Sequence, residues 1–263
     1  MRKRAGEGMT GELGKALKYP MVGGAWMRCL LPGGLLSLAW IPGINRALPV
    51  IGGAAPFSLG VFIWQVAAVL ATIFIAGYWM RIVRNTLAGI DEAPPWAPLP
   101  DVVSDGIAAL IVLICYSVLP WLCMATGAAM LSRGAVFALA GHCLLPLGFL
   151  LGLIADLLIP AAFVRLADDG RVPAAINIPL VWQHIAGSLR DYVTLYAVWL
   201  GVTFVWWLLS FQISPWAWGR IISAVSAFYI MTVFLRAFST LFTTEEPEPA
   251  QSLGSQYDTA YRP

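Results

Sequence analysis

The stretch GIAALIVLICYSVLPWLCMATGAAMLS, residues Gly106 to Ser132, contains no Asp, Glu, Lys or Arg. A hydrocarbon core about 30 Å thick is crossed by about 20 apolar helical residues, so this stretch is long enough to span a bilayer. The whole chain has a similar character, with 59% hydrophobic and 11% charged residues among 263. An ordinary soluble domain carries roughly a quarter charged residues. We therefore expect the excess apolar surface to face lipid.

Five other stretches complete the predicted bundle. Three of them carry no charged residue: Phe57 to Met80, Tyr192 to Gly219 and Ile221 to Leu235. A fourth, Ala135 to Val164, carries only Asp156, and the fifth, Cys29 to Leu48, is interrupted by prolines and glycines. The last is either a kinked span or a re-entrant segment. The sequence predicts an all-α integral membrane helical bundle of about six transmembrane helices, arranged as three hairpins with interfacial amphipathic helices.

The basic residues are distributed unequally across these spans. With the N-terminus inside, 13 Lys and Arg fall on the inner side and 3 on the outer side, namely Arg46, Arg133 and Arg220. Short loops rich in Lys and Arg stay in the cytoplasm. We therefore expect a multi-pass protein of the cell inner (plasma) membrane with cytoplasmic N- and C-termini. A net charge of +2 without a clustered basic surface gives no support to a nucleic-acid partner.

Three regions follow from this pattern. Residues 1–28 are expected to form a cytoplasmic or interfacial N-terminal segment, and residues 29–240 the multi-pass transmembrane domain. Residues 241–263 are polar, acidic and contain proline, so we expect a disordered cytoplasmic tail.

Three spans end in a similar way at the inner side, with an aromatic residue followed by arginine. The three endings are Tyr78 to Arg84, Ala162 to Arg165 and Val233 to Arg236. Short amphipathic stretches follow the first two. In the second stretch apolar residues recur at helical spacing from Ile178 to Tyr192, and Asn177 is suited to cap the helix. Each hairpin is therefore expected to follow an interfacial segment that lies in the headgroup plane.

The first of these elbows reads GYWMRIVRNTLAG from Gly77 to Gly89, followed by Asp91-Glu92, a Pro-rich turn and Asp105-Gly106. These residues resemble the signature of a bacterial and archaeal family of multi-pass membrane proteins catalogued as domain of unknown function 4013. The motif covers about Gly77 to Leu113, and the hydropathy pattern is similar over most of the chain. The resemblance implies a multi-helical inner-membrane protein and no established activity.

Asp156 is the strongest candidate for a functional polar side chain inside a span, because a carboxylate at membrane depth is costly. Gly148, Gly152, Asp156 and Pro160 recur every four residues, which places a GxxxG helix-packing strip and the acid on roughly one helix face. Pro160 lacks an N–H and leaves the Asp156 carbonyl oxygen available. Two interpretations stay open: a proton or ion relay, or a partly hydrated acid near the inner interface or beside an inner-facing arginine.

Arg81, Arg84 and Arg165, at the inner ends of two spans, are candidates for contacts with lipid phosphates. Arg81 and Arg84 are three residues apart and share a helix face. They can bind either phosphates or nearby carboxylates. Those carboxylates belong to Asp91, Glu92, Asp101 and Asp105. A role as topology determinants alone explains the two arginines equally well.

The remaining reactive side chains predict neither a metal site nor a cofactor. Cys123, His142 and Cys143 are expected at similar depth, but adjacent residues diverge by about 100° on a helix and no fourth ligand is evident. No catalytic or nucleotide-binding motif occurs in a suitable context. We therefore expect no enzyme activity.

The leading hypothesis is a non-enzymatic scaffold, assembly or lipid-organising component. Its expected partners are the lipid bilayer, anionic lipid headgroups, and a membrane protein partner or a second copy of the chain. The alternative is a small transporter or channel that uses Asp156 in an intramembrane polar pathway. A membrane enzyme ranks third.

Overall fold

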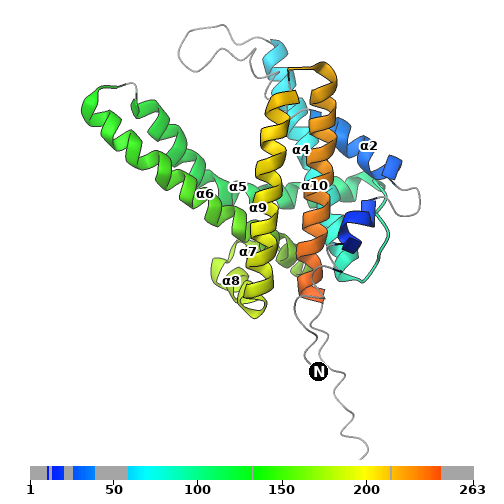
Figure 1. The fold of residues 1–263 in the computed structure, drawn as a ribbon. Helices are drawn as coiled ribbons and strands as arrows, with labels where there is room; N and C mark the ends of the chain where they lie inside the picture. The colour runs from blue at the N-terminus through cyan, green and yellow to red at the C-terminus, as the bar shows by residue number, and fades with distance from the viewer. Residues whose placement is uncertain are drawn as a thin grey trace, which may run out of the picture.

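The computed structural model describes residues 11, 14–20, 26–38, 59–131, 133–213 and 215–243, and the regular secondary structure within them is helical (Figure 1). Five of the helices, α4, α5, α6, α9 and α10, are long and apolar enough to cross a membrane. The helix bounds are α2 Trp26–Ser37, α4 Leu59–Leu87, α5 Leu99–Leu131, α6 Ala135–Asp169, α7 Val172–Ile176, α8 Ile178–Gly187, α9 Leu189–Ile213 and α10 Ala217–Thr243. The predicted all-α, multi-pass membrane architecture is confirmed for the described residues.

The first predicted span, Cys29 to Leu48, is described in part. Helix α2 covers its beginning with 12 residues and contains Pro32. Residues 39–48 lie outside the described part of the chain. The described part of the chain therefore contains five helices able to span a membrane, where the sequence predicts about six.

At their elbow ends the spanning helices extend beyond the apolar stretches, which end at Met80 and Val164. Helix α4 continues through both elbow arginines to Leu87, and α6 continues to Asp169. Glycines with positive φ follow them, Gly89 at 70° and Gly170 at 65°. A charge at the membrane surface leaves the helical hydrogen bonds intact, whereas a left-handed glycine ends them.

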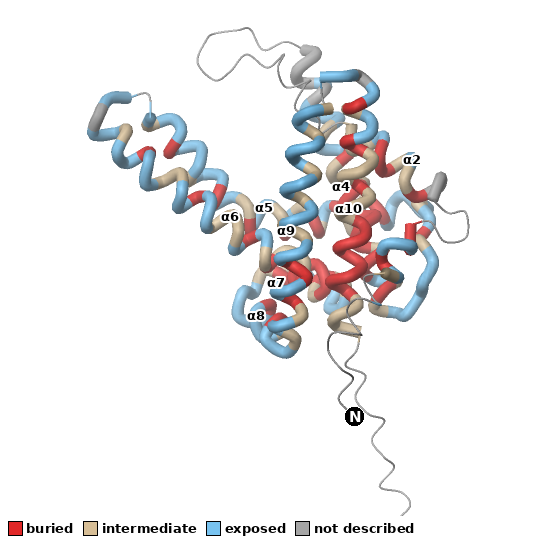
Figure 2. Tube along the Cα trace, in the orientation of Figure 1, coloured by how far each residue is buried: buried red, intermediate tan, exposed pale blue. Residues whose placement is uncertain are grey.

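The core lies toward the elbow end of the bundle, meaning the end that holds the α4–α5 and α6–α9 connections (Figure 2). Its largest fully buried side chains include Ile75, Met80, Phe163, Phe228 and Phe238. They come from α4, α6 and α10, and α2 packs on the same cluster. The ring of Phe228 lies against Gly33, where any larger residue would displace it. These contacts make α2, α4, α10 and the end of α6 one packed unit.

The outer part of the α5–α6 hairpin, residues 117–150, leaves this unit and is called the arm below. Figures 1 and 2 show it diverging from α9 and α10. The buried residues described within the arm are Pro120, Gly127, Gly141 and Gly148. Each lies where α5 and α6 face each other, and the outward faces of the arm are apolar and exposed. The arm is therefore packed only on itself and depends on lipid or another protein to cover its flanks.

The second interfacial segment forms α7 and α8, which connect the elbow ends of α6 and α9. The Asn177 side chain accepts a hydrogen bond from the Leu180 amide at 3.4 Å, which confirms it as the cap of α8. Val181 and Ile185 are fully buried against the bundle, while Trp182 is exposed. One face of α8 thus anchors it to the core.

Candidate functional site

Helices α4 and α5 cross in backbone contact at Gly77 and Gly106. A Cβ atom on Gly77 would collide with the Val102 carbonyl oxygen, and one on Gly106 would collide with the Ile73 carbonyl oxygen. Small residues are what allow spanning helices to approach this closely. The crossing places the two turns of α4 after Gly77, which carry the elbow arginines, directly beside the start of α5.

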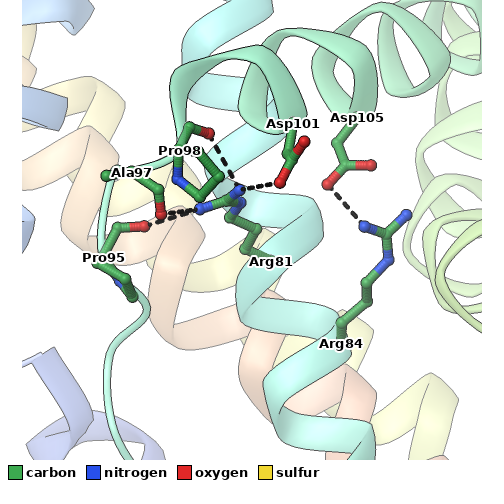
Figure 3. Close-up of polar contacts among 7 residues, drawn as sticks. All are labelled: Arg81, Arg84, Pro95, Ala97, Pro98, Asp101 and Asp105. Atoms are coloured by element: carbon green, nitrogen blue, oxygen red, sulfur yellow. Dashed lines mark hydrogen bonds and ion pairs between the residues drawn. The ribbon is translucent and has the colours of Figure 1, made fainter.

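Arg81 is the centre of this elbow (Figure 3). Its guanidinium donates hydrogen bonds to the carbonyl oxygens of Pro95 at 3.1 Å, Ala97 at 2.6 Å and Pro98 at 3.2 Å. The same group lies 3.6 Å from a carboxylate oxygen of Asp101, and the arginine side chain is only 14% exposed. Arg81 therefore fixes the Pro-rich loop to α4. Hydrogen bonds from a charged donor to backbone carbonyl oxygens are stronger than those between neutral groups.

The Pro-rich loop is also held by an aromatic contact. The ring of Trp96 stacks on that of Tyr78 with centroids 4.1 Å apart and planes 9° apart. Tyr78 is fully buried. Trp96 thus packs against the core of the bundle, while Pro95, Ala97 and Pro98 beside it remain exposed.

The other two arginines predicted to face lipid phosphates also lie beside carboxylates. Arg84 contacts Asp105 at 2.6 Å, with the arginine side chain 43% and the aspartate 13% exposed. Arg165 contacts Asp169 at 3.0 Å, one helical turn away on α6. Lipid phosphates and nearby carboxylates were both open as partners of Arg81 and Arg84. In the structure Arg81 lies beside the carboxylate of Asp101, and Arg84 lies beside that of Asp105.

A fourth arginine forms a lock between three distant segments. Arg236 of α10 pairs with the Asp91 carboxylate, although it is itself buried and Asp91 is largely exposed. Its guanidinium also lies 3.7 Å from the centre of the Tyr19 ring, within the range of a cation–π contact. The Tyr19 hydroxyl donates to the Glu92 carbonyl oxygen at 3.1 Å. Burial raises the pKa of the Tyr19 hydroxyl, so it remains a neutral donor.

This lock was not predicted from the sequence, although the repeated arginine signature included Arg236. Together the four pairs neutralise Arg81, Arg84, Arg165 and Arg236 within the chain. These four arginines therefore hold helices and loops of the elbow end together.

Asp156 has a different environment. It lies within the spanning segment Val136–Asp169 and its side chain is exposed on the surface of the chain. None of the described residues forms an ion pair or a hydrogen bond with its carboxylate, and the nearby Arg165 is engaged by Asp169. The arginine partner considered for Asp156 is therefore not found among the described residues.

Two tyrosines of α9 approach α6 beside Asp156. The Tyr192 hydroxyl donates to the Leu157 carbonyl oxygen at 2.6 Å, and the Tyr196 hydroxyl donates to the Leu153 carbonyl oxygen at 2.9 Å. Asp156 lies close enough to Tyr196 to interact with it electrostatically. The Asp156 carbonyl oxygen was predicted to be an available acceptor, but the two tyrosines bind the carbonyl oxygens of Leu153 and Leu157 instead. Their spacing of four residues was the missed signal, since it places both hydroxyls on one face of α9.

The glycine strip on α6 lies against α5. A Cβ atom on Gly148 would press on Met124 and the Pro120 carbonyl oxygen, and one on Gly152 would just touch Pro120. Eight residues rotate a helix about 80° beyond two full turns. Asp156 is therefore turned away from the α5 contact made by Gly148, toward the side of α6 that α9 approaches.

The cysteine and histidine candidates do not converge on a site. His142 and Cys143 are exposed on the arm, and Cys123 is half-buried on α5. Among the described residues no three His, Cys, Asp or Glu side chains form a group suited to a metal ion.

Comparison with known proteins places the chain in a family. The description "Protein of unknown function (DUF4013)" belongs to the family whose pattern matches residues 60–214, which is more than half of the 263 residues. The match runs from the start of α4 to the end of α9, so it contains the glycine crossing, the arm and Asp156. No curated protein and no solved structure matches the chain. The chain, a multi-pass membrane protein by its apolar helices, belongs to the DUF4013 family of proteins of unknown function.

Proposed function

We propose that this protein is a non-enzymatic scaffold or assembly component of a membrane complex. The observation that carries the proposal is the contrast between the packed bundle and the arm, whose buried residues are confined to the contact between α5 and α6. Exposed apolar residues such as Trp121, Leu139 and Phe149 line its flanks. A hairpin held out from a rigid base offers a long surface at membrane depth on which another membrane protein can pack.

The proposal includes the inner (plasma) membrane as the location, with both termini in the cytoplasm. Its support is the excess of Lys and Arg on the elbow side of the spans. It also includes anionic lipid headgroups as partners of the elbow end. With the elbow arginines engaged by carboxylates, the exposed basic side chains Lys18, Arg171 and Arg190 are the better candidates for that contact.

A photo-crosslinking residue placed in the arm of the full-length protein in living cells tests the scaffold proposal. Benzoylphenylalanine at Phe149, which is 59% exposed on α6, is expected to give a discrete crosslinked product of higher mass. The same residue at Ile63, which is 58% exposed on α4, serves as the control for random lipid-phase encounters. Equal products at both positions, or none at Phe149, would count against a scaffold.

Transport is the second candidate function, and a single observation favours it. Asp156 is exposed within a span and has no partner for its carboxylate among the described residues. Such a group can bind a proton or a cation during transport. Ion or proton flux into vesicles that contain the purified protein, abolished by Asp156→Asn in a correctly folded variant, would favour transport over a scaffold.

A further inference from the structure

The surface between α6 and α9 around Asp156 has no counter-charge. We call it the α6–α9 seam and define it by Phe149, Leu153 and Asp156 on α6 with Tyr192 and Tyr196 on α9. The seam begins at the membrane surface, where Tyr192 directly follows Arg190 and Asp191 in the first turn of α9. It runs into the bilayer along α6, where Asp156 is nine residues, or about 14 Å along the helix axis, from Arg165. A carboxylate at this depth, exposed toward hydrocarbon, is costly unless water or another group satisfies it.

The charged groups nearest the seam are already occupied or lie at the membrane surface. Arg165 pairs with Asp169 on the same helix, and Arg236 of the neighbouring α10 pairs with Asp91. Arg190 and Asp191 lie in the first turn of α9, before both tyrosines. The hydroxyls of Tyr192 and Tyr196 are donated to backbone carbonyls of α6. The described residues thus supply Asp156 with neither a cation nor a hydrogen-bond donor.

The apolar surroundings of the carboxylate are open to another helix. Phe149 lies two turns before Asp156 on the same face and is 59% exposed. Toward the outer end of the arm, α6 moves away from α9, as Figure 1 shows. On α9, Trp207 lies three turns beyond Tyr196 on nearly the same face and is 56% exposed, so it continues the apolar surface.

We propose that the α6–α9 seam seats a transmembrane helix of a partner protein, and that a Lys or Arg side chain of this helix pairs with Asp156. The inference rests on the proposed scaffold function and names the chemistry of its partner. A basic side chain supplies both the opposite charge and the hydrogen-bond donors that the carboxylate lacks. The apolar body of the helix covers Phe149 and the flank of the arm.

A second copy of this chain is a poorer occupant. Four of its arginines near the elbow end, Arg81, Arg84, Arg165 and Arg236, are paired with carboxylates. Arg171 and Arg190 are exposed at the elbow surface, and Arg133 lies in the turn between α5 and α6 at the far end of the arm. Arg220 lies in the first turn of α10, at the opposite end of that helix from the elbow. None of these places a cation at the depth of Asp156 in a parallel neighbour.

The test uses the full-length protein in lipid nanodiscs with benzoylphenylalanine at Phe149 and synthetic membrane-spanning peptides. One peptide is a Leu-rich helix with a single Lys in its middle, and the other has Leu at that position. Crosslinking to the Lys peptide is expected to exceed that to the Leu peptide about tenfold, the effect of one good interhelical polar contact. Asp156→Asn should remove this preference, whereas Asp105→Asn, which also removes one carboxylate, should preserve it.

The outcomes separate this inference from the scaffold proposal. Equal capture of both peptides by the unaltered protein would overturn the cation partner, while a discrete product at Phe149 in cells would still support a scaffold. A product in cells that contains only a second copy of this chain would overturn the partner helix in favour of self-association. Absence of any product at Phe149 in cells would remove the scaffold itself.

Discussion

The α4–α5 elbow and the α6–α9 seam use the same kinds of residue in opposite ways. At the elbow, Arg81 has three carbonyl acceptors and a carboxylate, and Arg84 has Asp105. At the seam, the carboxylate of Asp156 has no ion-pair or hydrogen-bond partner among the described residues, although it lies within a span. A satisfied polar group contributes to folding, whereas an unsatisfied one at membrane depth costs free energy and is retained for another purpose.

The comparison teaches that charge alone does not identify a functional site in a membrane protein. The elbow carries more charge and the more distinctive motif, yet its groups are occupied within the chain. Mutations should therefore damage stability at the elbow and binding at the seam. The four predictions below test this division.

The largest effect is expected at the glycine crossing that positions the elbow. Gly77→Ala places a Cβ atom against the Val102 carbonyl oxygen, so α4 and α5 must separate. We expect a loss of about 3 kcal/mol in unfolding free energy, measured by SDS titration of the protein in bicelles. Gly201→Ala on α9, where a Cβ meets nothing within 4 Å, is the matched control. Equal losses in both variants would refute the crossing.

The next largest effect concerns Arg81. Arg81→Gln removes the charge from a group that satisfies three backbone carbonyls, and it should lower the unfolding free energy by about 2 to 3 kcal/mol. Limited proteolysis should also cut the loop near Pro95 faster, because Arg81 no longer holds it. Arg133→Gln in the exposed turn of the arm removes the same charge and should change neither measurement. A protected loop in the Arg81 variant would contradict this account.

At the seam the expected sign is reversed. Asp156→Asn removes the charge of an unpaired carboxylate, so the isolated protein in bicelles should become more stable, by about 1 kcal/mol. Asp105→Asn at the elbow should lower stability by a similar amount because it leaves Arg84 without its partner. If Asp156→Asn destabilises the isolated protein, Asp156 already has a partner within the chain, and the division between elbow and seam fails.

The smallest effect should come from Arg84. Its side chain is 43% exposed, so the solvent screens its attraction to Asp105. Arg84→Gln is expected to cost less than about 1 kcal/mol. That cost should shrink further when the unfolding is measured at high salt. A cost as large as that of Arg81→Gln would show that exposure does not distinguish the two arginines.

The amino-acid pattern predicts the spanning helices and misses most of what joins them. Hydropathy alone places α4, α5, α6, α9 and α10, because lipid requires long apolar helices. Hydropathy ends α4 at Met80, whereas the helix runs to Leu87 and Gly89 follows it. The length of a charge-free stretch reflects the thickness of the hydrocarbon layer, whereas the residue at which a helix ends depends on backbone conformation.

The tertiary contacts were harder to anticipate for a different reason. Arg81 had four acidic residues within reach in the sequence, and only the crossing at Gly77 decides that Asp101 is beside it. The pairing of Asp91 with Arg236 joins residues 145 positions apart, and local spacing carries no signal of it. Asp156 was identified from the sequence because the free-energy cost of a carboxylate depends on its depth in the membrane, and the position of a residue within an apolar stretch indicates that depth.

The lock formed by Tyr19, Asp91 and Arg236 has a consequence for biosynthesis. Four of the five described spanning helices precede α10, so they leave the ribosome before the Arg236 cation that contacts Tyr19 and Asp91 has been synthesised. The N-terminal segment therefore cannot complete its contacts until α10 has been synthesised. A nascent chain arrested after α9 would retain its inserted helices, while the segment around Tyr19, which is buried in the complete protein, would remain accessible to quality-control proteases.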